Sequence, residues 1–269
     1  MNKFTPQSNK EFWNNYAKKS KDNPHGAHSD YHVVELENRF IINELKSKKT
    51  FSLLDIGCGN GQRTLMFSKF TEGKVKGIDY SEEMISEAKK LHLMQDEAIK
   101  NRLSFEIEDV NNLKDSYFDT IISCRCFINQ PSENDQIKLF NTLYDKMAQN
   151  GSLIIAEQSM EGIQRLNKIR ERFNLEPINI RWYNLPIKEN IVFDKIKDLF
   201  NIKSINRLGT FYYISRVINP ALSFPDEPKP NSKINEIGLK SEVIFQEMFG
   251  QNCTFEEFGA QLLVHFIKK

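Results

Sequence analysis

The sequence predicts an α/β protein whose sheet is mostly parallel and covered by helices on both faces. Short apolar segments alternate with amphipathic segments over residues 1–160, and several of the apolar segments end in an acidic residue. A glycine-rich turn follows the first of these apolar segments. The order βαβαβ is typical of such a sheet, and 269 residues fit one domain with an insertion.

The first predicted strand runs directly into the glycine turn. Leu53–Ile56 is apolar apart from Asp55, and Gly57, Gly59 and Gly61 follow at every second position. Glycine lets the backbone turn tightly and lets a ligand approach bare N–H groups. A strand, such a turn and a helix start together predict a nucleoside site.

The second predicted strand, Val75–Asp79, ends in a carboxylate. In a βαβ unit this carboxylate lies beside the glycine turn and can accept hydrogen bonds from both ribose hydroxyls. A cap for the next helix is the alternative role for Asp79. Gln62 stands where a dinucleotide pattern requires glycine, and Asp55 would repel a pyrophosphate but suits an ammonium group. The spacing therefore disfavours an NAD-dependent oxidoreductase.

The arrangement D-x-G-x-G-x-G from Asp55 to Gly61 resembles motif I of the class I S-adenosylmethionine-dependent methyltransferases. The resemblance covers roughly residues 1–160. It implies a Rossmann-like, seven-stranded sheet of order 3-2-1-4-5-7-6 with the last strand antiparallel. It also implies S-adenosyl-L-methionine as cofactor and S-adenosyl-L-homocysteine as product. We expect no metal ion, because two neighbouring cysteines do not make a zinc site. The expected cofactor-binding residues are Asp55, Gly57, Cys58, Gly59, Asn60, Gly61, Asp79, Tyr80, Met84, Asp109, Val110 and Arg125.

The third predicted strand lies within residues 104–110, and the resemblance implies that residues at its end bind the adenine ring. In the family, the residue matching Asp109 contacts the adenine amino group, and the backbone at Val110 contacts the ring. Tyr80 would lie against the adenine face. The alternatives are a solvated loop acid for Asp109 and a surface side chain for Tyr80.

The chain divides into four segments of a single domain. These are an N-terminal lid (1–45), a cofactor-binding core (46–208), an insert that binds the acceptor (209–259) and the last strand (260–269). Phe12, Trp13 and Tyr16 have helical spacing in the lid. Further helices are predicted at 161–173 and 189–200, and strands at 202–208 and 260–267. The insert is long and keeps large aromatic side chains, which favours a binding element over a linker.

Methyl transfer to a hydroxyl group requires a base, whereas a carboxylate, phosphate or thiolate acceptor requires none. His28 is one candidate base, because it lies in the lid loop and histidine titrates in the useful range. Glu157 is the other, since it ends the fifth strand, where open α/β sheets bind ligands. A surface histidine and a helix-capping acid are the respective alternatives.

Arginines and aromatic residues outside the cofactor motifs predict a polar acceptor pocket. Arginine holds carboxylate or phosphate groups through a planar fork, although several of these residues could instead form surface salt bridges. The expected residues are Asn129, Arg181, Trp182, Asn184, Tyr212, Tyr213, Arg216 and Asn235. The segments that carry them resemble a bacterial subgroup of methyltransferases associated with surface-polysaccharide (capsule or lipopolysaccharide) biosynthesis.

The expected function is methyl transfer to a small polar acceptor, with O-methylation of a sugar, sugar-phosphate or related capsular precursor favoured. Such an acceptor can be anionic or nucleotide-linked. An RNA or protein methyltransferase and a non-catalytic regulatory subunit that binds the cofactor are the alternatives. A net charge of +1 gives no electrostatic footprint for nucleic acid.

Composition predicts a cytoplasmic protein. The sequence is 39% hydrophobic and 27% charged, without an apolar run that could span a membrane and without a signal peptide at its start. Its four cysteines form no CxxC pair, which favours reduced thiols over a zinc site or disulfides.

Overall fold

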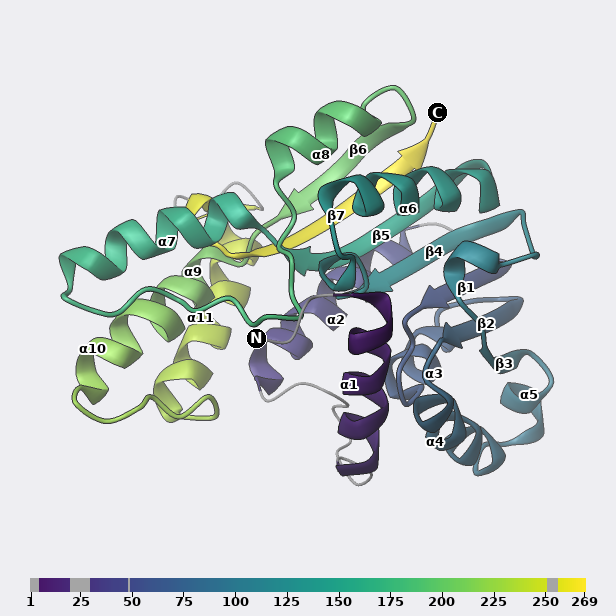
Figure 1. Ribbon diagram of the computed structural model, residues 1–269, viewed down its shortest axis with the longest axis horizontal. Helices are drawn as coiled ribbons and strands as arrows, with labels where there is room; N and C mark the ends of the chain where they lie inside the picture. The colour runs from purple at the N-terminus through teal and green to yellow at the C-terminus, as the bar shows by residue number, and fades with distance from the viewer. Residues whose placement is uncertain (1–4, 20–29, 48, 251–255) are drawn as a thin grey trace.

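The computed structural model describes residues 5–19, 30–47, 49–250 and 256–269, which form a seven-stranded sheet flanked by helices (Figure 1). The strand order is β3-β2-β1-β4-β5-β7-β6. Strand β7 runs antiparallel to both neighbours, and the other pairs are parallel. The predicted order and the antiparallel last strand are confirmed. The strands are β1 (Ser52–Ile56), β2 (Lys74–Asp79), β3 (Leu103–Ile107), β4 (Phe118–Cys124), β5 (Met147–Gln158), β6 (Phe200–Asn206) and β7 (Gln261–Lys268).

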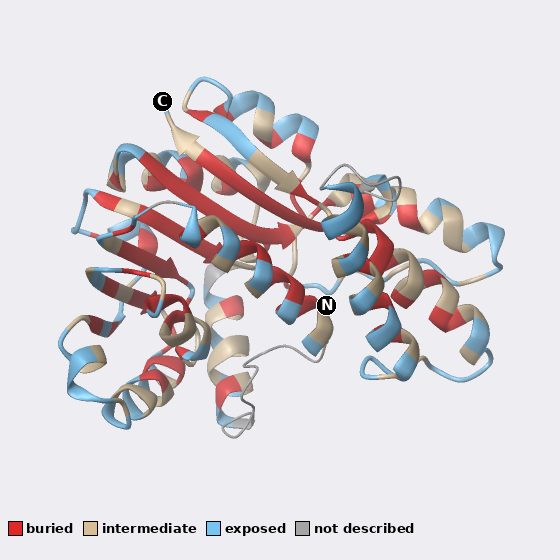
Figure 2. Ribbon diagram, turned by 180° about the vertical axis from the view of Figure 1, so that it is seen from behind, coloured by how far each residue is buried: buried red, intermediate tan, exposed pale blue. Residues whose placement is uncertain are grey.

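Two apolar cores cover the two faces of the sheet, because successive strand residues point in opposite directions. Leu53 belongs to one core and Leu54 to the other, and both are fully buried. The first core is covered by α2 (Tyr31–Lys46), α3 (Gln62–Ser68) and α4 (Glu82–Leu93). The second is covered by α6 (Glu133–Lys146) and α8 (Glu189–Ile196). The central strands are therefore buried along most of their length, as Figure 2 shows.

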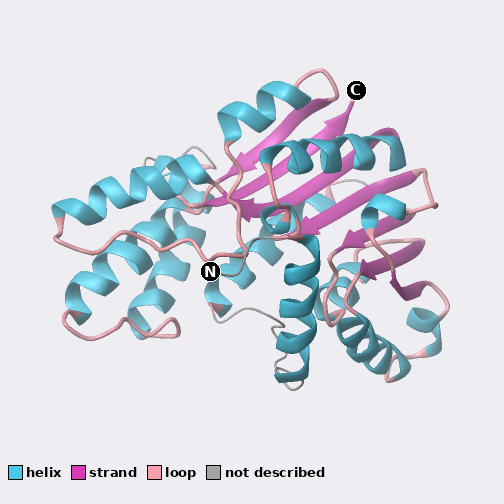
Figure 3. Cartoon of the chain, viewed as in Figure 1, coloured by secondary structure: helices cyan, strands magenta, loops and turns pink. Residues whose placement is uncertain are grey.

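The first helix, α1 (Pro6–Lys19), is packed beside the carboxyl ends of the strands and not on a sheet face (Figure 3). Its aromatic face packs against the loop at residue 183, with Phe12 stacked on Tyr183 at 4.2 Å between ring centroids. Asn14 accepts a hydrogen bond from the Ser81 hydroxyl at 2.6 Å. The helix thus bridges the loop at 183 and the start of α4.

The segment between β6 and β7 is helical. It comprises α9 (Gly209–Tyr213), the π-helical turn η3 (Ile214–Ile218), α10 (Asn219–Ser223), α11 (Lys233–Phe249) and the short helix η4 (Glu256–Phe258). These elements pack beside α7 (Met160–Arg172) and α2. Strand β6 ends at Asn206, two residues before the predicted end, because Leu208 adopts φ 52° and begins the turn into α9. Helix α8 ends at Ile196, before the predicted residue 200.

Short elements complete the core. Helix α5 (Glu97–Lys100) precedes β3, η1 (Val110–Asn112) follows it, and η2 (Phe127–Asn129) follows β4. The turns η1 and η2 lie at the carboxyl ends of parallel strands, where open α/β sheets bind ligands. Both contribute to the site described next.

Candidate functional site

A cleft of about 1070 Å³ lies at the carboxyl ends of the parallel strands. Its walls come from the glycine turn, the ends of β2 to β4, helices α1 and α2, the loop around residue 183, and the turn that includes α9 and η3. The predicted cofactor residues that line it are Asp55, Gly57, Cys58, Gly59, Asn60, Asp79, Tyr80, Met84, Asp109, Val110 and Arg125.

The glycine turn has the backbone conformation that its sequence predicts. Gly57, Gly59 and Gly61 have φ values of 65°, 55° and 77°, a region that favours glycine. Gly61 differs from the others because it does not line the cleft. A Cβ on it would lie 2.7 Å from the Phe105 ring and 2.9 Å from Ala88. Gly61 thus has a packing role, which lets α3 approach β3 and α4.

Asp79 joins the glycine turn to the start of α4. Its Oδ2 accepts a hydrogen bond from Gly59 N at 3.0 Å, and its Oδ1 accepts one from Ser81 N at 2.8 Å. Ser81 is the residue that caps α4, through its hydroxyl and Met84 N. The alternative in which Asp79 merely caps that helix is therefore wrong. Burial raises the pKa of Asp79, and the two backbone hydrogen bonds lower it.

Asp55 lies in β1, directly before the glycine turn, and connects this strand to α3. It is 3% exposed, and its Oδ2 accepts a hydrogen bond from the Thr64 hydroxyl at 2.6 Å. Burial raises its pKa to about 6, against the lowering effect of Thr64. The carboxyl group thus fixes α3 on β1 while Asp55 also lines the cleft.

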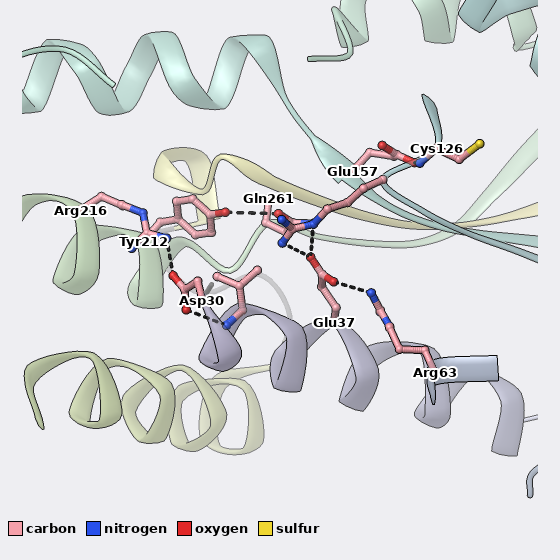
Figure 4. A network of polar contacts seen from close by, with 10 residues as sticks. Asp30, Glu37, Arg63, Cys126, Glu157, Tyr212, Arg216 and Gln261 are labelled. Atoms are coloured by element: carbon pink, nitrogen blue, oxygen red, sulfur yellow. Dashed lines mark hydrogen bonds and ion pairs between the residues drawn. The ribbon is translucent and has the colours of Figure 1, made fainter. Parts of the chain in front are cut away.

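A buried ion cluster joins α2 to the edge of this site (Figure 4). Glu37 is fully buried, and its Oε2 accepts a hydrogen bond from Arg63 Nη1 at 2.9 Å. Its Oε1 accepts one from Arg125 Nη2 at 2.8 Å and one from Gln261 Nε2 at 2.8 Å. Sequence reasoning missed Glu37. The available signal was its position four residues after Val33, because this spacing places Glu37 on the apolar stripe of the helix and predicts that it is buried.

Glu157 does not line the cleft. It is fully buried, and its Oε1 accepts hydrogen bonds from the Ser123 hydroxyl and from the backbone N–H groups of Cys126 and Phe127. Its Oε2 accepts one from Ile128 N at 3.1 Å. Burial raises its pKa to about 8, against these hydrogen bonds. The geometry contradicts the role of base and supports the alternative, an acid that caps the η2 turn.

Five of the predicted acceptor residues line the cleft. Arg181 donates a hydrogen bond to the Tyr183 hydroxyl at 2.6 Å. Arg216 forms an ion pair with Asp30 at the start of α2. The Tyr212 hydroxyl donates to a side-chain oxygen in β7. The five are Asn129, Arg181, Asn184, Tyr212 and Arg216.

Three other predicted acceptor residues lie outside the cleft. Trp182 is 40% exposed and packs edge-on against Phe12. Tyr213 packs against the apolar core. Asn235 is 1% exposed and donates a hydrogen bond to Pro230 O at 2.7 Å, so it stabilises the loop before α11. The remaining candidate, His28, lies outside the described residues.

Helix α1 brings polar groups that sequence reasoning did not assign to the site. Asn9 is 3% exposed and donates from Nδ2 to Asn129 O at 3.0 Å. Asn129 in turn donates from Nδ2 to Arg125 O at 2.7 Å. In the part of the chain that the structure describes, Asn9 Oδ1, Asn129 Oδ1 and Trp13 Nε1 are buried without a hydrogen-bond partner. All three residues line the cleft, so polar groups for a ligand are available under α1.

Metal-ligating side chains do not gather in the described ranges. No group of three or more histidine, cysteine, aspartate or glutamate side chains is placed there to hold a metal ion. Cys58, Cys124 and Cys126 are free thiols near the cleft. Among residues 5–19, 30–47, 49–250 and 256–269, no helix has the length and apolar character needed to cross a bilayer.

The sheet order, the glycine turn and the strand-end acids Asp79 and Asp109 together define a class I S-adenosylmethionine-dependent methyltransferase domain. The chain belongs to the methyltransferase-domain family, whose model matches residues 47–208.

The two curated relatives described next align with about half of this chain. An uncharacterized protein of Haemophilus influenzae is 34% identical over 124 residues, which are 44% of this chain and 45% of that protein. A malonyl-[acyl-carrier protein] O-methyltransferase of Ilyobacter polytropus is 29% identical over 143 residues, 52% of this chain and 48% of the relative. The chain thus spans about half the length of these relatives.

Solved structures match over nearly the whole chain. Magnesium protoporphyrin IX methyltransferase from Synechocystis, crystallised with bound S-adenosylhomocysteine, has a TM-score of 0.64 at 14% identity. The alignment covers 98% of this chain and 100% of that one. The N-methyltransferase NodS from Bradyrhizobium japonicum has a TM-score of 0.56 at 12% identity, with 97% and 98% covered. At these identities the likeness establishes the fold.

Proposed function

We propose that this chain transfers the methyl group of S-adenosyl-L-methionine to a small polar acceptor. The observation that carries the proposal is the position of Asp79, whose carboxylate lines the cleft while it anchors the glycine turn. The family match and the fold support the same activity.

The residues of the cleft fit this cofactor. Asp79 is available for the ribose hydroxyls, and Tyr80 and Val110 line the same cleft and are available for the adenine ring. Asp109 caps η1 by accepting a hydrogen bond from Asn111 N at 2.9 Å, and it also lines the cleft. We infer that these side chains hold the nucleoside as the sequence predicts, although Asp109 has a structural role as well.

The cofactor, when bound, supplies a methyl group activated by the adjacent sulfonium. The protein's own contribution is then to align the acceptor and to exclude water. Helix α1 suits both tasks because its aromatic stack against Tyr183 covers one side of the cleft. A base for a hydroxyl acceptor remains assigned to His28, since the hydrogen bonds and burial of Glu157 favour a structural role.

We propose a sugar, sugar-phosphate or related capsular precursor as acceptor, with O-methylation favoured. Arg181 supports an anionic group on the acceptor, because it lines the cleft and no carboxylate among the described residues forms an ion pair with it. Arg216 supports it less, since Asp30 already neutralises its charge. The similarity to a bacterial polysaccharide-associated subgroup motivates the sugar, and free cysteines suit a cytoplasmic location.

Calorimetry with S-adenosylhomocysteine tests the cofactor assignment. The variant Asp79→Asn keeps the side-chain size but loses the charge, and we expect its Kd to rise about 10- to 100-fold, as for the loss of charged hydrogen bonds. Asp194→Asn, which removes an exposed carboxylate in α8, is the matched control. Unchanged affinity in a folded Asp79→Asn variant would reject the ribose assignment.

Mass spectrometry tests the activity and the acceptor class. The protein is incubated with the cofactor and with a panel of sugars, sugar phosphates and nucleotide-linked sugars, and each is examined for one added methyl group. Activity on RNA or protein that weakens steeply with salt would favour the alternative substrates. Cofactor binding without transfer to any class would favour the regulatory alternative.

A further inference from the structure

We propose that Arg63 binds the carboxylate of the cofactor's methionyl group and that Glu37 positions Arg63 for this contact. The inference rests on the proposed function, and it adds a binding residue outside the glycine turn and the strand-end acids. Arg63 lies in α3, two residues after Gly61, and lines the cleft.

The hydrogen bonds of Arg63 leave one edge of its guanidinium group open. Nη1 donates to Glu37 Oε2 at 2.9 Å. Nε and Nη2 are buried and have no partner within the described residues. These two nitrogens form the edge of the fork that can grip a carboxylate with two parallel hydrogen bonds. Buried donors without partners are costly, so the geometry favours an anionic ligand here.

Arg125 provides a comparison within the same cluster. It directs the corresponding edge, Nε and Nη2, to Glu37 Oε1 at 3.3 and 2.8 Å. Its fork is therefore already occupied by a protein carboxylate. Arg63 is held by one nitrogen only, so it keeps the bidentate edge free.

The charge balance of the cluster also favours an added anion. Glu37 is a single buried carboxylate between two guanidinium groups. The other nearby acid, Asp55, directs its carboxyl group to the Thr64 hydroxyl, and burial raises its pKa. A ligand carboxylate on Arg63 would balance the second positive charge.

Asn38 offers a contact for the ammonium of the same amino-acid group. It follows Glu37 on α2 and lines the cleft, and its buried side-chain oxygen could accept a hydrogen bond from that ammonium.

Two ligands distinguish this contact from the binding of adenosine. S-adenosylhomocysteine carries the amino-acid group, whereas 5′-methylthioadenosine keeps the adenosine and the thioether but lacks the carboxylate. We expect Arg63→Met to raise the Kd of S-adenosylhomocysteine about 10- to 100-fold and to change that of methylthioadenosine less than about threefold. Arg39→Met is the matched control, because Arg39 lies on α2 with a half-exposed side chain.

The role of Glu37 requires a separate variant. Glu37→Gln keeps the size of the side chain but weakens its hold on Arg63, so the preference for S-adenosylhomocysteine over methylthioadenosine should decrease. A merely structural role would weaken both ligands equally. Arg63→Lys gives a further check in a variant that keeps the buried charge but loses the planar fork. It should also lose most of the preference, and thermal melting verifies that each variant is folded.

The outcomes separate this inference from the proposed function. If Arg63→Met and Arg63→Lys leave both affinities unchanged, or weaken both ligands by the same factor, the carboxylate contact is rejected. If the wild type binds neither ligand, the proposed function fails and the inference fails with it. A selective loss for S-adenosylhomocysteine supports both.

Discussion

Replacing Glu157 with glutamine separates the role of a base from that of a buried cap. The glutamine oxygen can still accept the three hydrogen bonds that Glu157 Oε1 receives. Its amide nitrogen, however, would face Ile128 N, which now donates to Oε2. A buried N–H without a partner costs about 1–3 kcal/mol. We therefore expect Glu157→Gln to lower the free energy of unfolding by about this amount, which lowers Tm by roughly 2–4 °C per kcal/mol.

The pH dependence supplies a second measurement on the same variant. Burial raises the pKa of Glu157 to about 8 in the folded state, above the ordinary value of 4.5 that applies after unfolding. The folded state thus binds the proton more tightly, so this contribution to stability is complete below about pH 4.5 and is lost as the pH rises through 8. The stability advantage of the wild type over Glu157→Gln should decrease across this range in chemical denaturation.

Turnover decides between the two roles. For an acceptor that the wild type methylates, the folded variant should retain its kcat within about threefold. A positioned base contributes about 10²–10⁴ in rate. A fall in kcat of that size with an unchanged Tm would refute the capping interpretation and restore Glu157 as the base.

Three further predictions test packing and acceptor binding. Gly61→Ala should lower stability by about 1–3 kcal/mol in thermal melts, because a Cβ would lie 2.7 Å from Phe105 and the residue has φ 77°; an unchanged Tm would contradict this packing role. Arg181→Lys should raise KM for the acceptor without changing the Kd of S-adenosylhomocysteine, since lysine keeps the charge but loses the fork; loss of cofactor binding would argue against it. Asn235→Ala should lower stability by about 1–3 kcal/mol through the lost hydrogen bond to Pro230 and leave KM unchanged; a changed KM would return Asn235 to the acceptor site.

The glycine turn and the strand-end acid beside it could be predicted because their signals are local in sequence. Strand alternation, the glycine positions and the acid at Asp79 lie within short segments whose geometry a βαβ unit fixes. The contacts of Glu37 could not be predicted, because its partners Arg125 and Gln261 are 88 and 224 residues away. The same holds for Asn9, which meets its partner 120 residues later.

The predicted roles of Asn235 and Glu157 are wrong because burial and hydrogen-bond partners cannot be seen in the sequence. The polarity of Asn235 favours a ligand contact, but in a helical insert a buried carboxamide can equally form a hydrogen bond within a loop. The position of Glu157 at a strand end predicts a catalytic role. That position also points the carboxylate at the backbone N–H groups of the next turn, Cys126 to Ile128, which satisfy it fully. Residue type and strand position do not distinguish these cases, whereas burial and hydrogen-bond partners do.

The origin of the cleft walls bears on how the acceptor is chosen. The family model spans residues 47–208 and so contains the glycine turn and the strand-end acids. Asn9 and Trp13 come from before this region, and Tyr212 and Arg216 come from after it, yet all four line the same cleft. The cleft is therefore lined in part by segments that the family match does not cover. We therefore expect substitutions in α1, α9 and η3 to change acceptor choice while the hydrogen bonds of Asp79 stay intact.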